Sequence, residues 1–136
     1  MQLARGPWIQ DTFVFIEVFG CEGGIQSYIK DVLTAYSNLD TVGTATIFLL
    51  RDSLDDIPPE FMSCFNFKCF QSGHPMVDRI RFTLSLAVHL FLKRPRHLFC
   101  GHINLAVMAR HLTRLANVPY TVLTYGKEVW FPLKPA

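Results

Sequence analysis

The chain has 136 residues, of which half are hydrophobic and 13% are aromatic, and its formal net charge is +2. This length suits one domain with a substantial core, and this composition excludes an intrinsically disordered chain. The mean hydropathy of +0.24 is high, but the longest apolar stretch, residues 82–92, is shorter than the ~18–20 residues that a membrane-spanning helix needs. The N-terminus lacks the pattern of a signal peptide, so we expect a cytoplasmic protein.

The charges are distributed unevenly along the chain. Residues 1–60 carry nine acids and three bases, whereas residues 61–136 carry ten bases and two acids. The interval from Arg79 to Arg114 holds seven Lys or Arg residues and no Asp or Glu. Because this block is mostly helical and lacks the basic and aromatic pattern of a nucleic-acid reader, we expect no nucleic-acid binding. The pattern predicts either a solvated basic face or a face toward an anionic membrane or substrate.

The sequence pattern alternates between strand and helix. Runs of β-forming residues bounded by turn residues predict strands at residues 13–19, 45–51, 64–70, 97–100 and 120–124. Apolar residues at helical spacing predict helices at residues 25–37, about 76–93 and 103–116. Residues 52–61 have the composition of a polar connection. This alternation predicts an α/β fold, a Rossmann-like, doubly wound parallel sheet of about five strands in the order 3-2-1-4-5, with helices on both faces.

The turn after the first strand has the composition of an anion-binding loop. Gly20 ends the strand, and the pair Gly23-Gly24 precedes the first helix. Adjacent glycines expose backbone N–H groups at the positive end of the helix dipole, which favours an anion such as a diphosphate. The spacing matches neither Gly-x-Gly-x-x-Gly nor a P-loop, and close packing of helix on strand explains the glycines equally well. The expected strand order favours binding, because it brings the loops after strands one and four to one edge of the sheet.

The long helix at residues 76–93 is apolar on two sides. We expect its core side to consist of Ile80, Leu84, Ala87, Val88 and Phe91. A second apolar line runs through Phe82, Leu86 and Leu90, and a narrow polar line through Arg81, Ser85 and His89. A helix of this kind is well buried or faces a second apolar partner. The partner is either a further domain or a membrane interface flanked by Arg79, Arg81, Lys93, Arg94 and Arg96.

Cysteine spacing gives no sign of a metal site. The chain has no Cys-x-x-Cys pair, and three of its four cysteines lie in apolar runs. The cysteines are Cys21, Cys64, Cys69 and Cys100. We therefore expect reduced cysteines in the core and no bound metal.

Three segments at the expected carboxyl edge of the sheet carry a resemblance to a known family. They are residues 23–26 (GGIQ), 101–106 (GHINLA) and 123–130 (LTYGKEVW). Together they resemble the N-terminal half of a glycosyltransferase of family four, of GT-B fold, over nearly the whole chain. The resemblance implies that residues 1–136 are the acceptor-side, Rossmann-like domain of a GT-B architecture whose C-terminal, donor-binding domain is missing. On this basis we expect a truncated chain that is inactive alone.

The resemblance also implies an activity and a set of site residues. Members of the family are retaining hexosyltransferases that move a sugar from a nucleotide-sugar to an acceptor, here a saccharide or a lipid-linked one. The nucleotide-sugar is a substrate, so no cofactor and no metal are expected. Gly23 and Gly24 would then lie at the donor diphosphate with Gln26 nearby, and His102 would reach the transferred sugar. The resemblance places Tyr125, Gly126, Lys127 and Glu128 at the cleft, with Tyr125 in place of a family histidine.

The residues themselves leave alternatives open. The His102 imidazole either binds a ligand hydroxyl or shuttles a proton, or it caps the following helix. Glu128 either binds an acceptor hydroxyl or pairs with a base such as Lys127. We expect His74, which precedes Pro75, to lie in a turn. We expect surface or edge positions for His89, His97 and His111.

Two other functions remain open. One is a stand-alone α/β module that docks on a membrane or a partner subunit without catalysis, and the other is an unrelated nucleotide-binding enzyme. As a glycosyltransferase, the chain is expected in the cytoplasm or peripherally on the inner face of the membrane.

Overall fold

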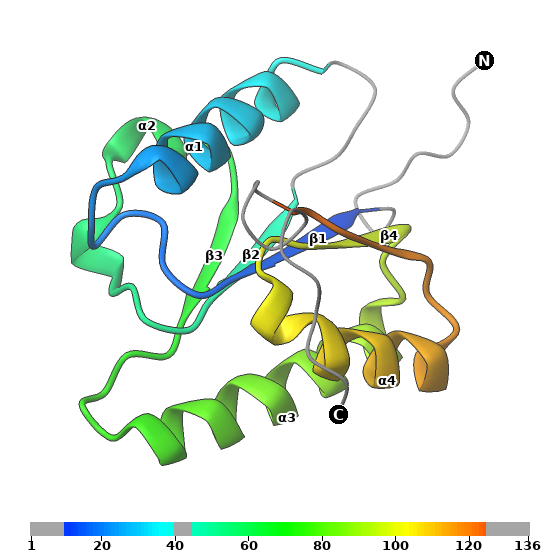
Figure 1. Cartoon of the computed structure of the whole chain (residues 1–136). Coiled ribbons are helices and arrows are strands. Elements are labelled where there is room, and N and C mark those ends of the chain that lie inside the picture. Colours follow the sequence, from blue (N-terminus) through cyan, green and yellow to red (C-terminus); the bar gives the residue numbers. More distant parts are fainter. Residues whose placement is uncertain (1–9, 40–44, 125–136) are drawn as a thin grey trace.

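The computed structural model describes residues 10–39 and 45–124, in which one parallel sheet lies between two layers of helices (Figure 1). The strands are β1 (Asp11–Phe15), β2 (Thr46–Leu49), β3 (Asn66–Cys69), β4 (His97–Cys100) and β5 (Tyr120–Val122). Their spatial order is β3-β2-β1-β4-β5, and every neighbouring pair is parallel. The predicted fold class, strand number and strand order are confirmed.

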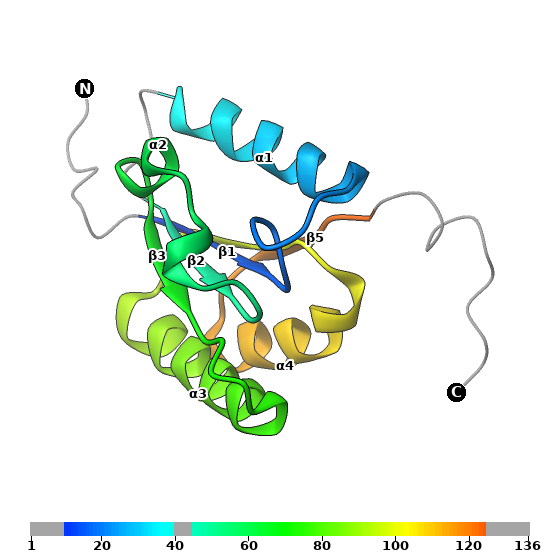
Figure 2. The same ribbon diagram turned by 90° about the vertical axis from the view of Figure 1, so that its left-hand side faces the viewer.

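The helices cover both faces of the sheet, as expected (Figure 2). On one face lie α1 (Gly24–Ser37) and the short α2 (Pro59–Met62), and on the other lie α3 (Pro75–Lys93) and α4 (Ala106–Ala116). Two 3-10 helices, η1 (Leu54–Asp56) and η2 (Ile103–Leu105), complete the described elements. The basic helices α3 and α4 therefore share one face, as the strand order requires for right-handed crossovers.

The connection between β2 and β3 is more ordered than its composition suggested. Residues 52–61 hold η1 and the start of α2 instead of a plain loop. Ser53 and Asp56 form a capping box at η1, and Pro59 occupies the first turn of α2. These local hydrogen bonds and the fixed φ of proline favour helical turns in a segment too polar to show a helical period.

The core has two halves, one on each face of the sheet. Phe13 of β1 stacks on Phe99 of β4 with ring centroids 5.0 Å apart and meets the edge of Tyr36 from α1 at 5.2 Å. On the opposite face, Phe48 of β2 meets the edge of Phe82 from α3 at 6.0 Å. Strands buried on both faces explain why the β1 and β2 sequences are apolar without alternation.

The buried side of α3 is the reverse of the one expected. Its buried residues are Asp78, Phe82, Leu86, His89 and Leu90. The expected core residues Ile80, Leu84, Val88 and Phe91 are exposed, and Ala87 is half-buried. His89 is thus a core residue and not a surface or edge position. This orientation of α3 involves a contact between residues distant in sequence, because the His89 Nε2 atom lies 2.8 Å from the hydroxyl of Thr12 in β1.

A half-buried ion pair links β1 to the residue before β4 at the amino end of the sheet. The Arg96 guanidinium donates two hydrogen bonds to the Asp11 carboxylate, at 3.0 and 2.6 Å, and the Tyr36 hydroxyl donates a third at 2.6 Å. The Asp11 side chain is almost fully buried. Arg96, one of the five bases that would flank a membrane interface, is thus paired with Asp11.

The cysteines are free, but they are not all in the core. Cys100 is buried and Cys69 is half-buried, whereas Cys21 and Cys64 are exposed. The expectation of core positions is therefore wrong for Cys21 and Cys64, which lie in the loops flanking α1 and β3. Among the described residues, no cluster of His, Cys, Asp and Glu is large enough to hold a metal ion. No helix in the described ranges has the length and apolarity needed to cross a membrane.

Candidate functional site

A buried carboxylate shapes the loop between β1 and α1. Asp52, just after β2, is fully buried and accepts backbone hydrogen bonds from Val18, Phe19 and Gly20 at 2.7, 3.1 and 2.7 Å. These N–H groups turn toward Asp52 instead of continuing a strand, which explains why β1 ends at Phe15 and not at residue 19 as predicted. A Cβ on Gly20 would lie 2.9 Å from the Asp52 carboxylate, so a glycine is needed there. The sequence analysis missed Asp52, whose only signal was an acid directly after a strand.

The glycine pair plays two different roles. Gly23 is the N-cap of α1 in an extended conformation, and a Cβ there would lie 2.7 Å from the Gln26 side chain. Gln26 in turn donates a long hydrogen bond of 3.4 Å to the carbonyl of Glu17, which closes the loop. Gly24 differs, because a Cβ there would meet no atom within 4 Å. A side chain at Gly23 would therefore only displace the flexible end of Gln26, and packing within the described chain gives no reason for Gly24.

The amino end of α1 presents unpaired backbone donors. No side chain caps this helix, and no acidic residue lies in its first turn. The first intrahelical hydrogen bond runs from the Ser27 N–H to the Gly23 carbonyl at 3.0 Å. The N–H groups of Gly24, Ile25 and Gln26 therefore have no acceptor within the helix. With the helix dipole behind them, these donors suit an anion.

His102 follows β4, the strand that neighbours β1. Its Nδ1 atom accepts a hydrogen bond of 3.0 Å from the Asn104 N–H, so this half-buried residue caps η2. A neutral His102 then carries its proton on Nε2, which leaves Nε2–H as a donor for a ligand. Gly101 beside it is needed for packing, since a Cβ there would overlap the Phe15 ring.

The thiols at this edge are poor nucleophiles. Burial raises the pKa of Cys100. Loss of water contacts, followed by the negative charge of Glu17, raises the pKa of Cys21. Both thiols are therefore protonated at neutral pH, and the reactive thiolate form is scarce.

The fold brings some of the predicted site residues to one edge of the sheet. Because β1 and β4 are adjacent and parallel, with Val14 opposite Cys100, the loops that follow them lie at the same edge of the sheet. Gly23, Gly24, Gln26 and His102 all belong to these loops or to the helices that begin there. The predicted cleft residues Tyr125, Gly126, Lys127 and Glu128 lie outside the described residues.

A pocket of about 240 Å³ lies at the same edge, beside the ends of β2 and β3. Its lining residues are Leu50, Arg51, Gln71, Gly73, Pro75, Asp78 and Arg79. The Ser72 hydroxyl and N–H donate to the Asp78 carboxylate, and the hydroxyl bond is the main reason that the pKa of Asp78 is lowered. With Asp78 held in this way, the other charged residues that line the pocket are Arg51 and Arg79, whose guanidinium groups suit an anionic or hydroxyl-rich ligand.

Comparison with known proteins supports the fold. No protein-family model matches the chain, and no curated protein matches it at a significant level. The solved structure of the apo form of the lipopolysaccharide outer core galactosyltransferase WaaB is similar, with a TM-score of 0.59 at 14% sequence identity. The match covers 84% of this chain and 32% of the galactosyltransferase chain. The described chain thus has the fold of one part of that enzyme.

Proposed function

We propose that this chain is the N-terminal, acceptor-side part of a retaining glycosyltransferase of family four, of GT-B fold. The reaction moves a sugar from a nucleotide-sugar to a saccharide or lipid-linked acceptor, without a metal ion. A complementary donor-binding domain, supplied in cis or in trans, completes the enzyme, and the chain is inactive alone. In this proposal the protein works in the cytoplasm, at the inner face of the membrane where the acceptor is lipid-linked.

The observation that carries the proposal is the environment of Gly24. It lies in the first turn of α1 at the switch point between β1 and β4, where ligands of open parallel sheets bind. Nothing in the described chain occupies the space next to its Cα atom, and the backbone N–H groups around it have no acceptor within the helix. A diphosphate fits such a site by charge and by the close approach that glycine permits.

The other residues follow from the same placement. His102 donates its Nε2–H to a hydroxyl of the transferred sugar, while Nδ1 remains fixed on Asn104. Glu128 acts at the cleft together with Tyr125, Gly126 and Lys127. A tyrosine at 125 donates a hydrogen bond, but it does not exchange a proton near neutral pH as an imidazole does. The similarity to a galactosyltransferase supports a sugar nucleotide as the donor class.

An NMR titration of the chain with nucleoside diphosphates tests this assignment. We expect weak, saturable binding, with the largest amide shift changes at residues 23–26 and a change in the His102 ring signals. Weak binding is expected because a cleft enzyme contacts its donor from both domains. Inorganic sulfate at equal ionic strength is the control for a nonspecific anion effect. Shift changes absent from residues 23–26, or equal with sulfate, would refute the diphosphate assignment.

A second candidate function rests on the exposed side of α3. Ile80, Leu84, Val88 and Leu92 are each more than half exposed, which is unusual for four large apolar residues along one helix. Such a face favours a module that docks on a membrane or a partner subunit. This alternative predicts a chain that is functional and monodisperse alone and shows no nucleoside diphosphate binding at α1.

A further inference from the structure

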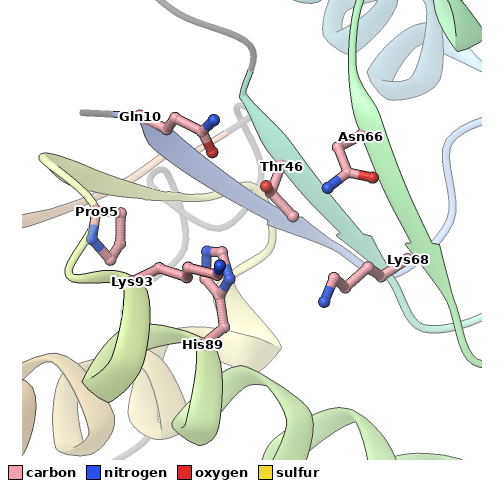
Figure 3. Close-up of a pocket in the computed structure, with 7 residues that line it drawn as sticks. All are labelled: Gln10, Thr46, Asn66, Lys68, His89, Lys93 and Pro95. Atoms are coloured by element: carbon pink, nitrogen blue, oxygen red, sulfur yellow. The ribbon is translucent and has the colours of Figure 1, made fainter. Parts of the chain in front are cut away.

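A second polar pocket lies at the opposite edge of the sheet from Gly24. It has a volume of about 340 Å³ and lies where β2 and β3 begin and α3 ends. Its lining residues, drawn in Figure 3, are Gln10, Thr46, Asn66, Lys68, His89, Lys93 and Pro95. This edge is formed by the amino ends of the strands, so the pocket is separate from the site proposed above.

The pocket is cationic and rich in hydrogen-bonding groups. Lys68 from β3 and Lys93 from the last turn of α3 reach into it from opposite sides (Figure 3). No Asp or Glu is among its described lining residues, whereas Gln10, Thr46 and Asn66 supply amide and hydroxyl groups. Two ammonium groups around neutral donors form a site for an anion with several acceptor oxygens.

His89 forms the inner wall between the two lysines. It is only 7% exposed, packs against the Phe48 ring at 5.2 Å and contacts the Thr12 hydroxyl. Burial, reinforced by the positive charges of Lys68 and Lys93, lowers its pKa to about 4. The ring is therefore neutral at pH 7, and Lys68 and Lys93 are the charged residues that line the pocket beside it.

The pocket continues into an apolar groove on the surface of α3. This adjoining groove shares Lys68, His89 and Lys93 with the pocket and adds Leu84, Ser85, Val88 and Leu92. Leu84 and Leu92 are 62% and 75% exposed, so their side chains are available for contact. A cationic pocket that opens onto a strip of exposed apolar side chains has the chemistry to bind an amphiphile.

We propose that this pocket binds the phosphate group of an anionic amphiphile, with the phosphate between Lys68 and Lys93 and the apolar part along Leu84, Val88 and Leu92. Charge complementarity selects the phosphate, and the apolar strip selects a lipid over a free phosphorylated metabolite. A docked protein domain would satisfy the apolar strip but would also need a carboxylate in the pocket to pair with the two ammonium groups. The proposal does not depend on glycosyl transfer, since none of these residues lies at the Gly24 edge.

The test is calorimetric titration of the full chain with three soluble probes. Dihexanoylphosphatidic acid carries both the phosphate and the chains, glycerol 3-phosphate carries only the phosphate, and dihexanoylphosphatidylcholine carries chains with no net charge. We expect saturable binding of the phosphatidic acid and at least about tenfold weaker binding of the other two. Glycerol 3-phosphate lacks the acyl chains, and the choline group of the phosphatidylcholine cancels the net charge of its phosphate.

Variants separate the pocket from general electrostatic attraction. Lys68→Gln combined with Lys93→Gln should weaken phosphatidic acid binding at least about tenfold, since two charge-assisted contacts are lost. Arg81→Gln is the matched control, because it removes one positive charge from α3 outside the pocket and should leave the affinity unchanged. Leu92→Ser should weaken the binding of phosphatidic acid and leave the affinity for glycerol 3-phosphate unchanged. All of these side chains are exposed, and circular dichroism checks that each variant folds.

The NMR titration of His89 gives an independent readout. A bound phosphate offsets the charges of Lys68 and Lys93, so binding should raise the pKa of His89 from about 4. Three results would overturn the proposal: no phosphatidic acid binding, equal affinity for glycerol 3-phosphate, or an equal loss in Arg81→Gln. The second would indicate a free phosphate as ligand, and the third a diffuse charge effect.

Discussion

Asp52 is the residue on which the loop before α1 depends. Its buried carboxylate accepts hydrogen bonds from three backbone N–H groups that lie 32 to 34 residues away in sequence. A buried carboxylate is stable only where such donors replace its water. The position of Gly23 and Gly24 at the edge of the sheet therefore depends on an acid that follows a different strand.

Asp52→Ala should lower the free energy of unfolding by about 3 kcal/mol, because it leaves buried backbone donors without an acceptor. Urea denaturation of both proteins measures the difference. Asp55→Ala is the matched control, since Asp55 is an exposed acid three residues away and its loss should change stability by less than about 0.5 kcal/mol. Equal stability of Asp52→Ala and wild type would contradict the structural role.

The residue patterns singled out the glycines and His102, whose roles stay predictions, and missed the buried positions of Asp52 and His89. Gly23, Gly24 and His102 are recognisable because each lies beside a strand end and a helix start in the sequence itself. Asp52 and His89 derive their roles from partners distant in sequence, namely the loop after β1 and Thr12. When only the sequence is considered, an acid after a strand and a histidine on a helix are both predicted to be surface residues.

At the scale of elements, α3 shows the limit of reading a helix by its period. Ile80, Leu84 and Val88 on one side are as apolar as Phe82, Leu86 and Leu90 on the other. Hydrophobic spacing therefore predicts a helix here, but it does not predict which of the two apolar sides faces the core. The structure buries the side that carries Phe82 and His89, because these reach the rings and hydroxyls of β1 and β2.

The rotation of α3 can be tested with two leucines one half-turn apart. Leu86 is 0% exposed and Leu84 is 62% exposed. Leu86→Ala should cost about 3 kcal/mol of unfolding free energy through lost burial and a cavity, whereas Leu84→Ala should cost less than about 0.5 kcal/mol. Chemical denaturation measures both. A larger loss in Leu84→Ala would contradict this orientation and would mean that the side with Ile80, Leu84 and Val88 faces the core.

At the scale of the whole molecule, the strand order was predictable from the sequence, and the placement of the candidate residues only partly so. Alternation of strands and helices, together with right-handed crossovers, leaves few ways to arrange β1 to β5. That order alone brings Gly24 and His102 to one edge. The pocket of Lys68 and Lys93 at the other edge was not predicted, because it depends on the rotation of α3. The two sites therefore lie at opposite edges of the sheet and can be tested separately.

The central claim is that the backbone at Gly24 binds a diphosphate, and Gly24→Val tests it most directly. A valine side chain there would point into open space, so the fold should persist, while its bulk would keep a phosphate from the N–H groups of α1. The measurement is the affinity of wild type, Gly24→Ala and Gly24→Val for nucleoside diphosphates, with the melting temperature of each as a check on folding. We expect binding to weaken with side-chain size and to be at least about tenfold weaker in Gly24→Val, at a nearly unchanged melting temperature. Equal affinity in all three proteins would contradict the account.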